Sequence, residues 1–270
     1  MKLLDGKEMA GFIQERQAKQ VRALRQAEGV VPKLAIVQTA DDPVIDTYVR
    51  MKQAYGAEIL IEVEHHKTSA ERLLETIDSL NADSSVHGII VQLPLANREQ
   101  TDEAVNRVAP EKDVDGLGQA AQFDPATPMA IDWLVNGYNI ELKGKKIAIV
   151  GNGRLVGAPL ARLWQTAGYA VTVFDNSSPA VASKLRRYQV VVSAAGVPGL
   201  VTSQSIQPGA VVIDAATATE EGKVVGDIAD DVRERTDLTI TPKKGGVGPL
   251  TVCALFDNVI RAARRTVSTN

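Results

Sequence analysis

Polar and apolar positions in the first half of the chain alternate between helical and strand patterns. Solid apolar runs of strand length are separated by segments with an apolar residue about every three or four positions. The predicted strands are residues 33–39, 57–65 and 86–95, and the predicted helices are residues 5–28, 44–54 and 69–83. Solidly apolar strands that alternate with helices indicate a parallel sheet covered on both faces. The first half is therefore predicted to be α/β.

The pattern is lost after residue 110, where Pro, Gly, Asp and Ala are frequent and periodicity is weak, as is typical of loops. Thr127 and Pro128 then favour the N-cap and first position of a helix that runs to about Val135. We predict the domain boundary just beyond this helix. The predicted domains are residues 1–138, joined by a C-terminal helix over 250–270, and residues 139–249.

The second half begins with a strand, a glycine-rich turn, a helix and another strand, the order of a βαβ unit. Its predicted strands are residues 145–150, 169–175, 190–196 and 210–216, and its predicted helices are residues 158–168 and 252–265. We therefore expect two α/β domains that flank a cleft, the second being a Rossmann-type dinucleotide-binding domain.

Composition narrows the possible partners of the chain. The 270 residues carry 30 Lys and Arg against 33 Asp and Glu, a net charge of -3. This balance gives no general attraction to nucleic acid or to membranes. The apolar runs are shorter than a membrane span, and the charged start is unlike a signal peptide, so we expect a cytoplasmic protein.

Cysteine and histidine content argues against a metal site. Cys253 is the only cysteine, which excludes an intramolecular disulfide and favours a small core residue. His65, His66 and His87 do not have metal-ligand spacing with Cys or carboxylates, so no metal is expected.

The glycine turn GNGRLVG is the first candidate site. Between a strand and a helix, such a turn can receive a pyrophosphate on backbone N–H groups and the helix N-terminus. The candidate cofactor-binding residues are Gly151, Asn152, Gly153, Arg154, Val156 and Gly157. Asp175 ends the next strand, where a carboxylate can bind a ribose 2′-hydroxyl and repel a 2′-phosphate. Arg154 could contact either phosphate, so the cofactor is NAD or NADP with NAD favoured; the alternative is a tight turn without a ligand.

The first domain offers a second candidate site. Tyr48 and Lys52 lie four residues apart in a predicted helix and so share one face, which is also common on ordinary helix surfaces. Gln92 ends a buried strand, where its amide could orient a lysine amine. Asp115 lies in a glycine-bearing loop, and its alternative, like that of Asp113, is a turn residue.

Taken in order, the motifs resemble a known family over nearly the whole chain. They are DDPVIDTYVRMK, VQLPL, PEKDVDG, TP before a helix, GNGRLVGAP, VVGD and GGVGPLT. The chain resembles the bifunctional 5,10-methylenetetrahydrofolate dehydrogenase/5,10-methenyltetrahydrofolate cyclohydrolase (FolD) family. The resemblance implies oxidation of 5,10-methylenetetrahydrofolate by NAD(P)⁺, hydrolysis of the methenyl product to 10-formyltetrahydrofolate, and a homodimer.

The resemblance also implies residue roles. Lys52 is the catalytic lysine, Tyr48 packs on the aminobenzoyl ring of the folate, Gln92 supports the lysine, and Asp115 holds the pterin. By the same resemblance Thr217 contacts the cofactor, and Pro242 and Gly245 contact the substrate.

The chain also departs from the family pattern. Gly153 stands where the family usually has serine, and Asn152 where it often has arginine, so both lean toward NAD. Leu117, Gly118 and Ala126 also differ, near the folate. The alternatives are therefore a dehydrogenase without cyclohydrolase activity and a non-catalytic folate or dinucleotide binder. A dehydrogenase for a small hydroxy acid is disfavoured because no catalytic His with a partner Asp is evident, and an ATP-dependent synthetase because no phosphate-binding GxxxxGK[ST] loop is present.

Overall fold

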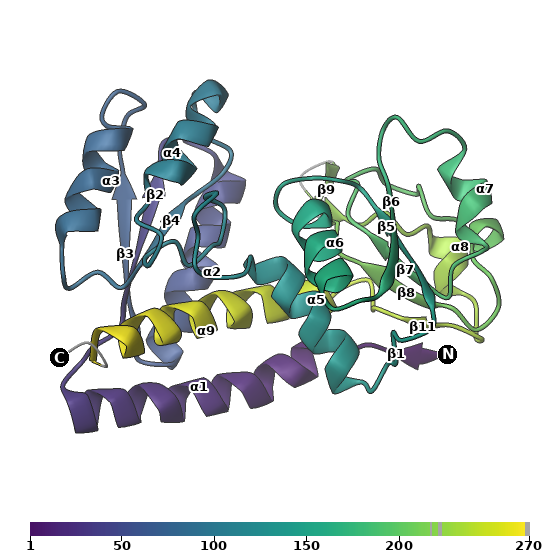
Figure 1. Cartoon of the computed structure of the whole chain (residues 1–270), viewed down its shortest axis with the longest axis horizontal. Coiled ribbons are helices and arrows are strands. Elements are labelled where there is room, and N and C mark those ends of the chain that lie inside the picture. Colours follow the sequence, from purple (N-terminus) through teal and green to yellow (C-terminus); the bar gives the residue numbers. More distant parts are fainter. Residues whose placement is uncertain (217, 221–222, 268–270) are drawn as a thin grey trace. The chain divides into compact units, whose positions relative to one another are not determined.

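The computed structural model describes residues 1–216, 218–220 and 223–267, and these form two compact units (Figure 1). We call Met1–Ala10 with Thr127–Thr251 the six-stranded unit. Gly11–Ala126 with the chain from Val252 onward is the three-stranded unit. Two long helices, α1 (Gly6–Glu28) and α9 (Val247–Val267), each contribute residues to both units. The division into functional domains at residues 1–138 with 250–270 and residues 139–249 stays a prediction.

The three-stranded unit is a parallel α/β fold, as the apolar patterns predict. Its strands are β2 (Lys33–Gln38), β3 (Glu62–Lys67) and β4 (Gly88–Val91), and its helical segments are α2 (Pro43–Glu58), α3 (Leu73–Ala82), η1 (Arg98–Gln100) and α4 (Thr101–Arg107). The order β3-β2-β4 puts β2 in the centre, so the chain turns to one side of β2 and then returns on its other side. Apolar residues of α3 and α4 cover one face of this sheet.

Local chemistry explains where α2 begins and why its end differs from the prediction. Asp42 caps the helix by accepting a hydrogen bond from the Val44 N–H at 2.7 Å, and Pro43 fits the first turn. The helix continues to Glu58, and the chain then reverses at Leu60, whose φ is +65°. Strand β3 therefore begins at Glu62, later than the predicted 57, because packing extends the helix beyond the residues that the pattern assigns to it.

The six-stranded unit contains the predicted βαβ segment inside a larger parallel sheet. The strands of this unit are β1 (Lys2–Leu3), β5 (Lys146–Val150), β6 (Ala170–Phe174), β7 (Val190–Ser193), β8 (Val211–Asp214), β9 (Ala218–Glu220), β10 (Lys223–Val225) and β11 (Thr239–Ile240). Its helical segments are α5 (Ala126–Gly137), α6 (Gly157–Thr166), α7 (Val181–Leu185), η2 (Ser203–Ser205) and α8 (Asp230–Arg233). The main sheet has the order β1-β11-β8-β7-β5-β6, and β9 and β10 form a separate antiparallel pair.

This strand order is of the Rossmann type, as predicted. The chain passes from β5 to β6 on one side and then to β7 on the other, so a topological switch point lies between β5 and β7. Ligands of such sheets bind outside the carboxyl ends of the strands at this point. The short strands β1 and β11 were not predicted, because two residues are too few to produce a pattern.

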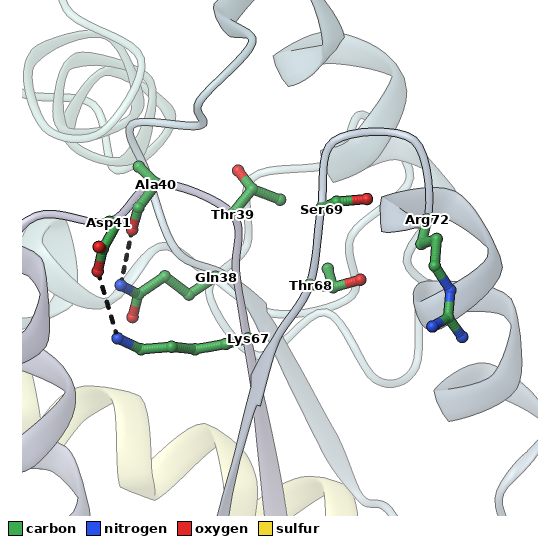
Figure 2. Close-up of a pocket in the computed structure, with 8 residues that line it drawn as sticks. All are labelled: Gln38, Thr39, Ala40, Asp41, Lys67, Thr68, Ser69 and Arg72. Carbon is green, nitrogen blue, oxygen red and sulfur yellow. Dashed lines mark hydrogen bonds and ion pairs between the residues drawn. The ribbon is translucent and has the colours of Figure 1, made fainter.

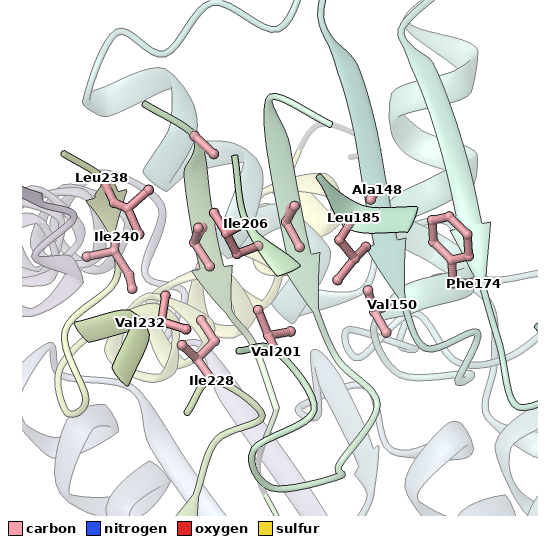
Figure 3. Packing of buried hydrophobic residues seen from close by; sticks show 13 residues of the cluster. Ala148, Val150, Phe174, Leu185, Val201, Ile206, Ile228, Val232, Leu238 and Ile240 are labelled. Atoms are coloured by element: carbon pink, nitrogen blue, oxygen red, sulfur yellow. The ribbon is translucent and has the colours of Figure 1, made fainter. Parts of the chain in front are cut away.

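A continuous apolar core holds this sheet together (Figure 3). Val150, Phe174 and Val191 from the strands pack with Leu185 of α7 and Val232 of α8 on one face. Full burial of such side chains stabilises the fold by about 1.5–3 kcal/mol each. The core thus fixes the strand ends that carry the glycine turn.

Two further features are the position of Cys253 and the apolar character of the helices. Cys253 is buried on α9, as expected for a small core residue. Within the described residues, none of the helices has the length and apolar character that a membrane crossing requires.

Candidate functional site

Three of the four candidates of the first domain meet at the carboxyl ends of the strands of the three-stranded unit. Helix α2 follows β2 and carries Lys52, Gln92 directly follows β4, and Asp115 lies in the loop beyond an isolated bridge between Ile89 and Asp113. Since β2 and β4 are neighbours, this place is the switch point of the smaller sheet.

Lys52 and Gln92 form the closest pair of this group. The Lys52 Nζ donates a hydrogen bond to Gln92 Oε1 at 2.6 Å. The Gln92 Nε2 donates to the Leu93 carbonyl at 3.1 Å, which turns the amide so that its oxygen faces the amine. The Gln92 amide therefore orients the amine without adding a charge.

Burial lowers the pKa of Lys52 from its ordinary value of 10.5, and the negative charge of Asp115 opposes this shift. A lysine with a lowered pKa exchanges protons at a pH nearer to neutrality than an exposed lysine does. The side chain also keeps some accessible surface, so a ligand can reach it.

The pKa of Asp115 is shifted upward, opposite to that of Lys52. Burial raises its pKa to about 6; the charge of Lys52 lowers this pKa, and that of Asp113 raises it. No hydrogen bond to the Asp115 carboxylate occurs within the described part of the chain. Its oxygens are therefore available to a ligand that brings its own N–H donors.

Asp113 organises the loop that presents Asp115. Only 4% of Asp113 is exposed, and its carboxylate accepts hydrogen bonds from the N–H groups of Gly116 at 3.0 Å and Gly118 at 2.7 Å. Gly116 has a φ of +68°, which favours glycine. The sequence alternative for Asp113, a turn residue, describes this role, whereas its deep burial could not be read from the sequence.

Tyr48 lies one turn before Lys52 on α2, and its ring is partly exposed. The structure thus keeps both side chains on neighbouring turns of one helix, as their spacing predicts.

A pocket that the sequence did not reveal lies at the carboxyl ends of β2 and β3 (Figure 2). It is lined by Gln38, Thr39, Ala40, Asp41, Lys67, Thr68, Ser69 and Arg72. Lys67 pairs with Asp46 at 3.1 Å and with Asp41 at 3.6 Å, and Gln38 Nε2 donates to the Ala40 carbonyl at 2.7 Å. The Lys67 charge is thus already balanced by carboxylates, and Gln38 is held in place.

The glycine turn of the six-stranded unit is built for close backbone approach. A Cβ on Gly151, whose φ is +102°, would lie 2.3 Å from the Ala194 carbonyl oxygen. A Cβ on Gly157 would lie 1.9 Å from the Gly151 oxygen, whereas one on Gly153 would meet no atom within 4 Å. The outer glycines therefore close the turn, and the middle one leaves open space before the N-terminus of α6.

The remaining turn residues lie around this space. Asn152 and Arg154 are exposed, and Val156 is half-buried directly before α6. This arrangement fits a dinucleotide pyrophosphate, which such a turn binds through backbone N–H groups.

Asp175 directly follows β6, beside the turn. The Gly151 N–H donates to the carbonyl of Phe174, the preceding residue, at 2.7 Å. Asp175 Oδ1 accepts from the Ser177 N–H at 3.0 Å and from its hydroxyl at 2.6 Å, and these bonds lower the pKa of Asp175. Asp175 is therefore an anion at neutral pH.

The other predicted contacts lie elsewhere. Pro242 and Gly245 belong to the six-stranded unit, where the Gly245 carbonyl accepts from the Lys7 N–H at 2.9 Å. Thr217 lies outside the described residues. Among the described residues, no group of three or more His, Cys, Asp and Glu side chains could hold a metal ion.

Comparisons with known proteins match both parts of the chain. Residues 4–115 match the family model for the tetrahydrofolate dehydrogenase/cyclohydrolase catalytic domain, and residues 125–267 match that for the NAD(P)-binding domain of the same name. The bifunctional protein FolD of Macrococcus caseolyticus is 36% identical over 98% of each chain. That of Bordetella petrii is 37% identical over 98% of this chain and 95% of its own.

Solved structures agree with these matches. The bifunctional FolD methylenetetrahydrofolate dehydrogenase/cyclohydrolase of Campylobacter jejuni superposes with a TM-score of 0.92 at 33% identity, covering 98% of this chain and 99% of its own. The FolD enzyme of Trypanosoma brucei, solved with NADP cofactor and an inhibitor, has a TM-score of 0.92 at 31% identity and covers 98% of each chain.

Proposed function

Because this chain belongs to the tetrahydrofolate dehydrogenase/cyclohydrolase family, we propose that it oxidises 5,10-methylenetetrahydrofolate with NAD(P)⁺ and hydrolyses the methenyl product to 10-formyltetrahydrofolate. The observation that carries this proposal is the Lys52–Gln92 hydrogen bond beside a carboxylate that has open acceptor sites. A lysine with a lowered pKa suits proton transfer, and a free carboxylate suits a ligand with N–H donors.

The dehydrogenase step needs positioning more than acid or base. The methylene carbon lies between two nitrogens, whose lone pairs stabilise the cation left when a hydride departs. NAD(P)⁺ supplies the acceptor for that hydride. The chain contributes the glycine turn for the dinucleotide, while Asp115 and Tyr48 hold the folate by its pterin and its aminobenzoyl ring.

The cyclohydrolase step needs proton transfer, which we assign to Lys52. Water adds to the methenyl carbon, and the amine accepts a proton from it. The same amine then protonates the folate nitrogen as its bond to the carbon breaks, and the added hydroxyl loses its proton to solvent as the formyl carbonyl forms, so one proton is released overall. Gln92 Oε1 keeps Nζ in place during both transfers.

Asp115 recognises the pterin in this scheme. An ionised carboxylate that accepts from amino and ring N–H groups forms charge-assisted hydrogen bonds worth about 1.5–3 kcal/mol. The position of Asp115 near Lys52 brings the bound folate to the amine. Pro242 and Gly245 are proposed to contact the substrate as well.

We further propose NAD as the preferred cofactor. The Asp175 carboxylate would accept from the 2′-hydroxyl of the adenosine ribose and repel a 2′-phosphate. Gly153 and Asn152 leave this side of the turn without the serine and arginine that are usual in the family. Thr217 is proposed as a further cofactor contact.

A homodimer and a cytoplasmic location are proposed on the family resemblance. Strand β6 lies at one edge of the six-stranded sheet, with Val171 and Val173 only half-buried, which suits an interface. Light scattering after gel filtration should give about twice the chain mass of 28.9 kDa. A mass equal to that of one chain would contradict the dimer.

The proposal is tested by supplying 5,10-methenyltetrahydrofolate alone and following the loss of its absorbance. We expect hydrolysis by the wild-type protein and a rate about 10²–10⁴-fold lower in Lys52→Met. Arg50→Met is the control, because it also replaces a long cationic side chain of α2 by Met, at an exposed position. Equal rates in Lys52→Met and wild type would remove Lys52 from the mechanism.

The alternative functions are separated by measuring NAD(P)⁺ reduction, accumulation of the methenyl compound and binding of both ligands. A dehydrogenase without cyclohydrolase activity would reduce NAD(P)⁺ and accumulate the methenyl compound. A non-catalytic binder would bind both ligands and convert neither.

A further inference from the structure

Asp227, in the VVGD motif, lies in the six-stranded unit between β10 and α8 and has no accessible surface. Its carboxylate accepts three hydrogen bonds from the segment that ends β7. Oδ2 accepts from the Ser193 hydroxyl at 2.6 Å and the Ala195 N–H at 2.8 Å, and Oδ1 accepts from the Val197 N–H at 2.7 Å.

The segment held in this way packs on the glycine turn. The Ala194 N–H donates to the Val150 carbonyl at 2.7 Å, which joins the ends of β7 and β5. The backbone of Ala194 and Ala195 is so close to Gly151 that a Cβ on the glycine would lie 2.3–2.9 Å from three of its atoms. The two strand ends that meet here flank the topological switch point.

Asp227 is itself fixed from behind. Its N–H donates to Asp214 Oδ1 at 3.2 Å, and its carbonyl accepts from the Val201 N–H at 3.1 Å. Asp214 is anchored in turn by Arg233 at 2.9 Å. The carboxylate of Asp227 is therefore a rigid support and not a mobile surface group.

We propose that Asp227 is a positioning residue for the dinucleotide: it holds residues 194–197 against Gly151 and so shapes the floor on which the cofactor lies. This inference rests on the proposed function. Val197 is 47% exposed, and its backbone N–H is held by Asp227 Oδ1 beyond the end of β7, where the residue can contact the cofactor. A carboxylate is required because the Ala195 and Val197 N–H groups donate to different oxygens, and an amide offers only one acceptor oxygen.

The test uses Asp227→Asn and measures NADH and NADPH binding by fluorescence titration. Because the amide leaves at least one buried N–H without a partner, we expect the dissociation constant of the preferred cofactor to rise about tenfold. Hydrolysis of methenyltetrahydrofolate, which uses no dinucleotide, should keep its wild-type kcat/KM. Asp231→Asn changes an exposed carboxylate of the same unit that accepts one bond, from the Ser203 N–H, and it should change neither quantity.

Unchanged dinucleotide affinity in Asp227→Asn would overturn the proposal. A parallel loss of hydrolysis and affinity would indicate a merely structural role and would also count against it. If Asp227→Asn does not fold, Ser193→Ala keeps the carboxylate and removes one hydrogen bond. Ser193→Ala should weaken dinucleotide binding and leave methenyltetrahydrofolate hydrolysis intact. Unchanged dinucleotide affinity with impaired hydrolysis in this variant overturns the proposal. A wild-type protein that hydrolyses no methenyltetrahydrofolate contradicts the proposed function, whereas the binding titration still tests Asp227.

Discussion

Replacing Asp115 with Asn should stabilise the fold while it weakens folate binding. The carboxylate has a pKa of about 6 because burial disfavours its charge. Since one pKa unit corresponds to about 1.4 kcal/mol, raising the pKa from 3.8 to about 6 costs the folded state about 3 kcal/mol at neutral pH. Solvent reaches the half-buried group and screens part of this cost, so we expect a gain of about 1–2 kcal/mol in the variant.

The pH dependence follows from the direction of this shift. Well below the unfolded-state pKa of 3.8 the carboxyl is protonated in both the folded and the unfolded state, so wild type and Asp115→Asn should be equally stable. Between about pH 4 and pH 6 the unfolded state ionises first, and the advantage of the variant should grow. Above the folded-state pKa of about 6 the advantage should stay constant.

Urea unfolding at a series of pH values, with and without bound folate, measures both effects. Asp78→Asn is the control. Arg107 lowers the pKa of the exposed Asp78 carboxyl, so removal of the Asp78 charge should not stabilise the protein. The loss of charge-assisted bonds should raise the KM for methylenetetrahydrofolate in Asp115→Asn by about tenfold or more. A variant that is less stable than wild type at pH 7.5, or that binds folate equally well, would refute the assignment.

Three further predictions concern the two sites. Lys52→Met should lower kcat for methenyl hydrolysis by about 10²–10⁴-fold, the usual contribution of a general acid or base, while NADH titration stays normal. Asp175→Ser should raise kcat/KM with NADP⁺ relative to NAD⁺, and an unchanged ratio would show that another residue sets the preference. Gly157→Ala should lower Tm and the affinity for NAD(P)H. The added Cβ would lie 1.9 Å from the Gly151 oxygen, and overpacking of this kind costs about 1–3 kcal/mol. Wild-type affinity for NAD(P)H in this variant would contradict the prediction.

The sequence predicted the elements whose signals are local. The segments of β2, β4, β5 and β7 contain solid apolar runs, and the structure places a strand at each of them. Helix α5 begins at Ala126, before the predicted N-cap at Thr127, and sequence signals locate a helix end only to within one or two residues.

The arrangement of the sites depended on contacts between distant residues. Lys52 and Gln92 are 40 positions apart, and only strand order brings them to 2.6 Å. The supporting roles of Asp113 and Asp227 could not be predicted, because an Asp near glycines has the composition of any turn. Burial of these carboxylates is a property of the folded chain.

The most direct test follows the purified protein with 5,10-methylenetetrahydrofolate and either NAD⁺ or NADP⁺, recording reduced nicotinamide and the methenyl compound separately. We predict faster reduction with NAD⁺ and no accumulation of the methenyl compound. Reduction with accumulation would contradict the role given to Lys52. No reduction with either cofactor, in a protein that binds both, would contradict the proposed function as a whole.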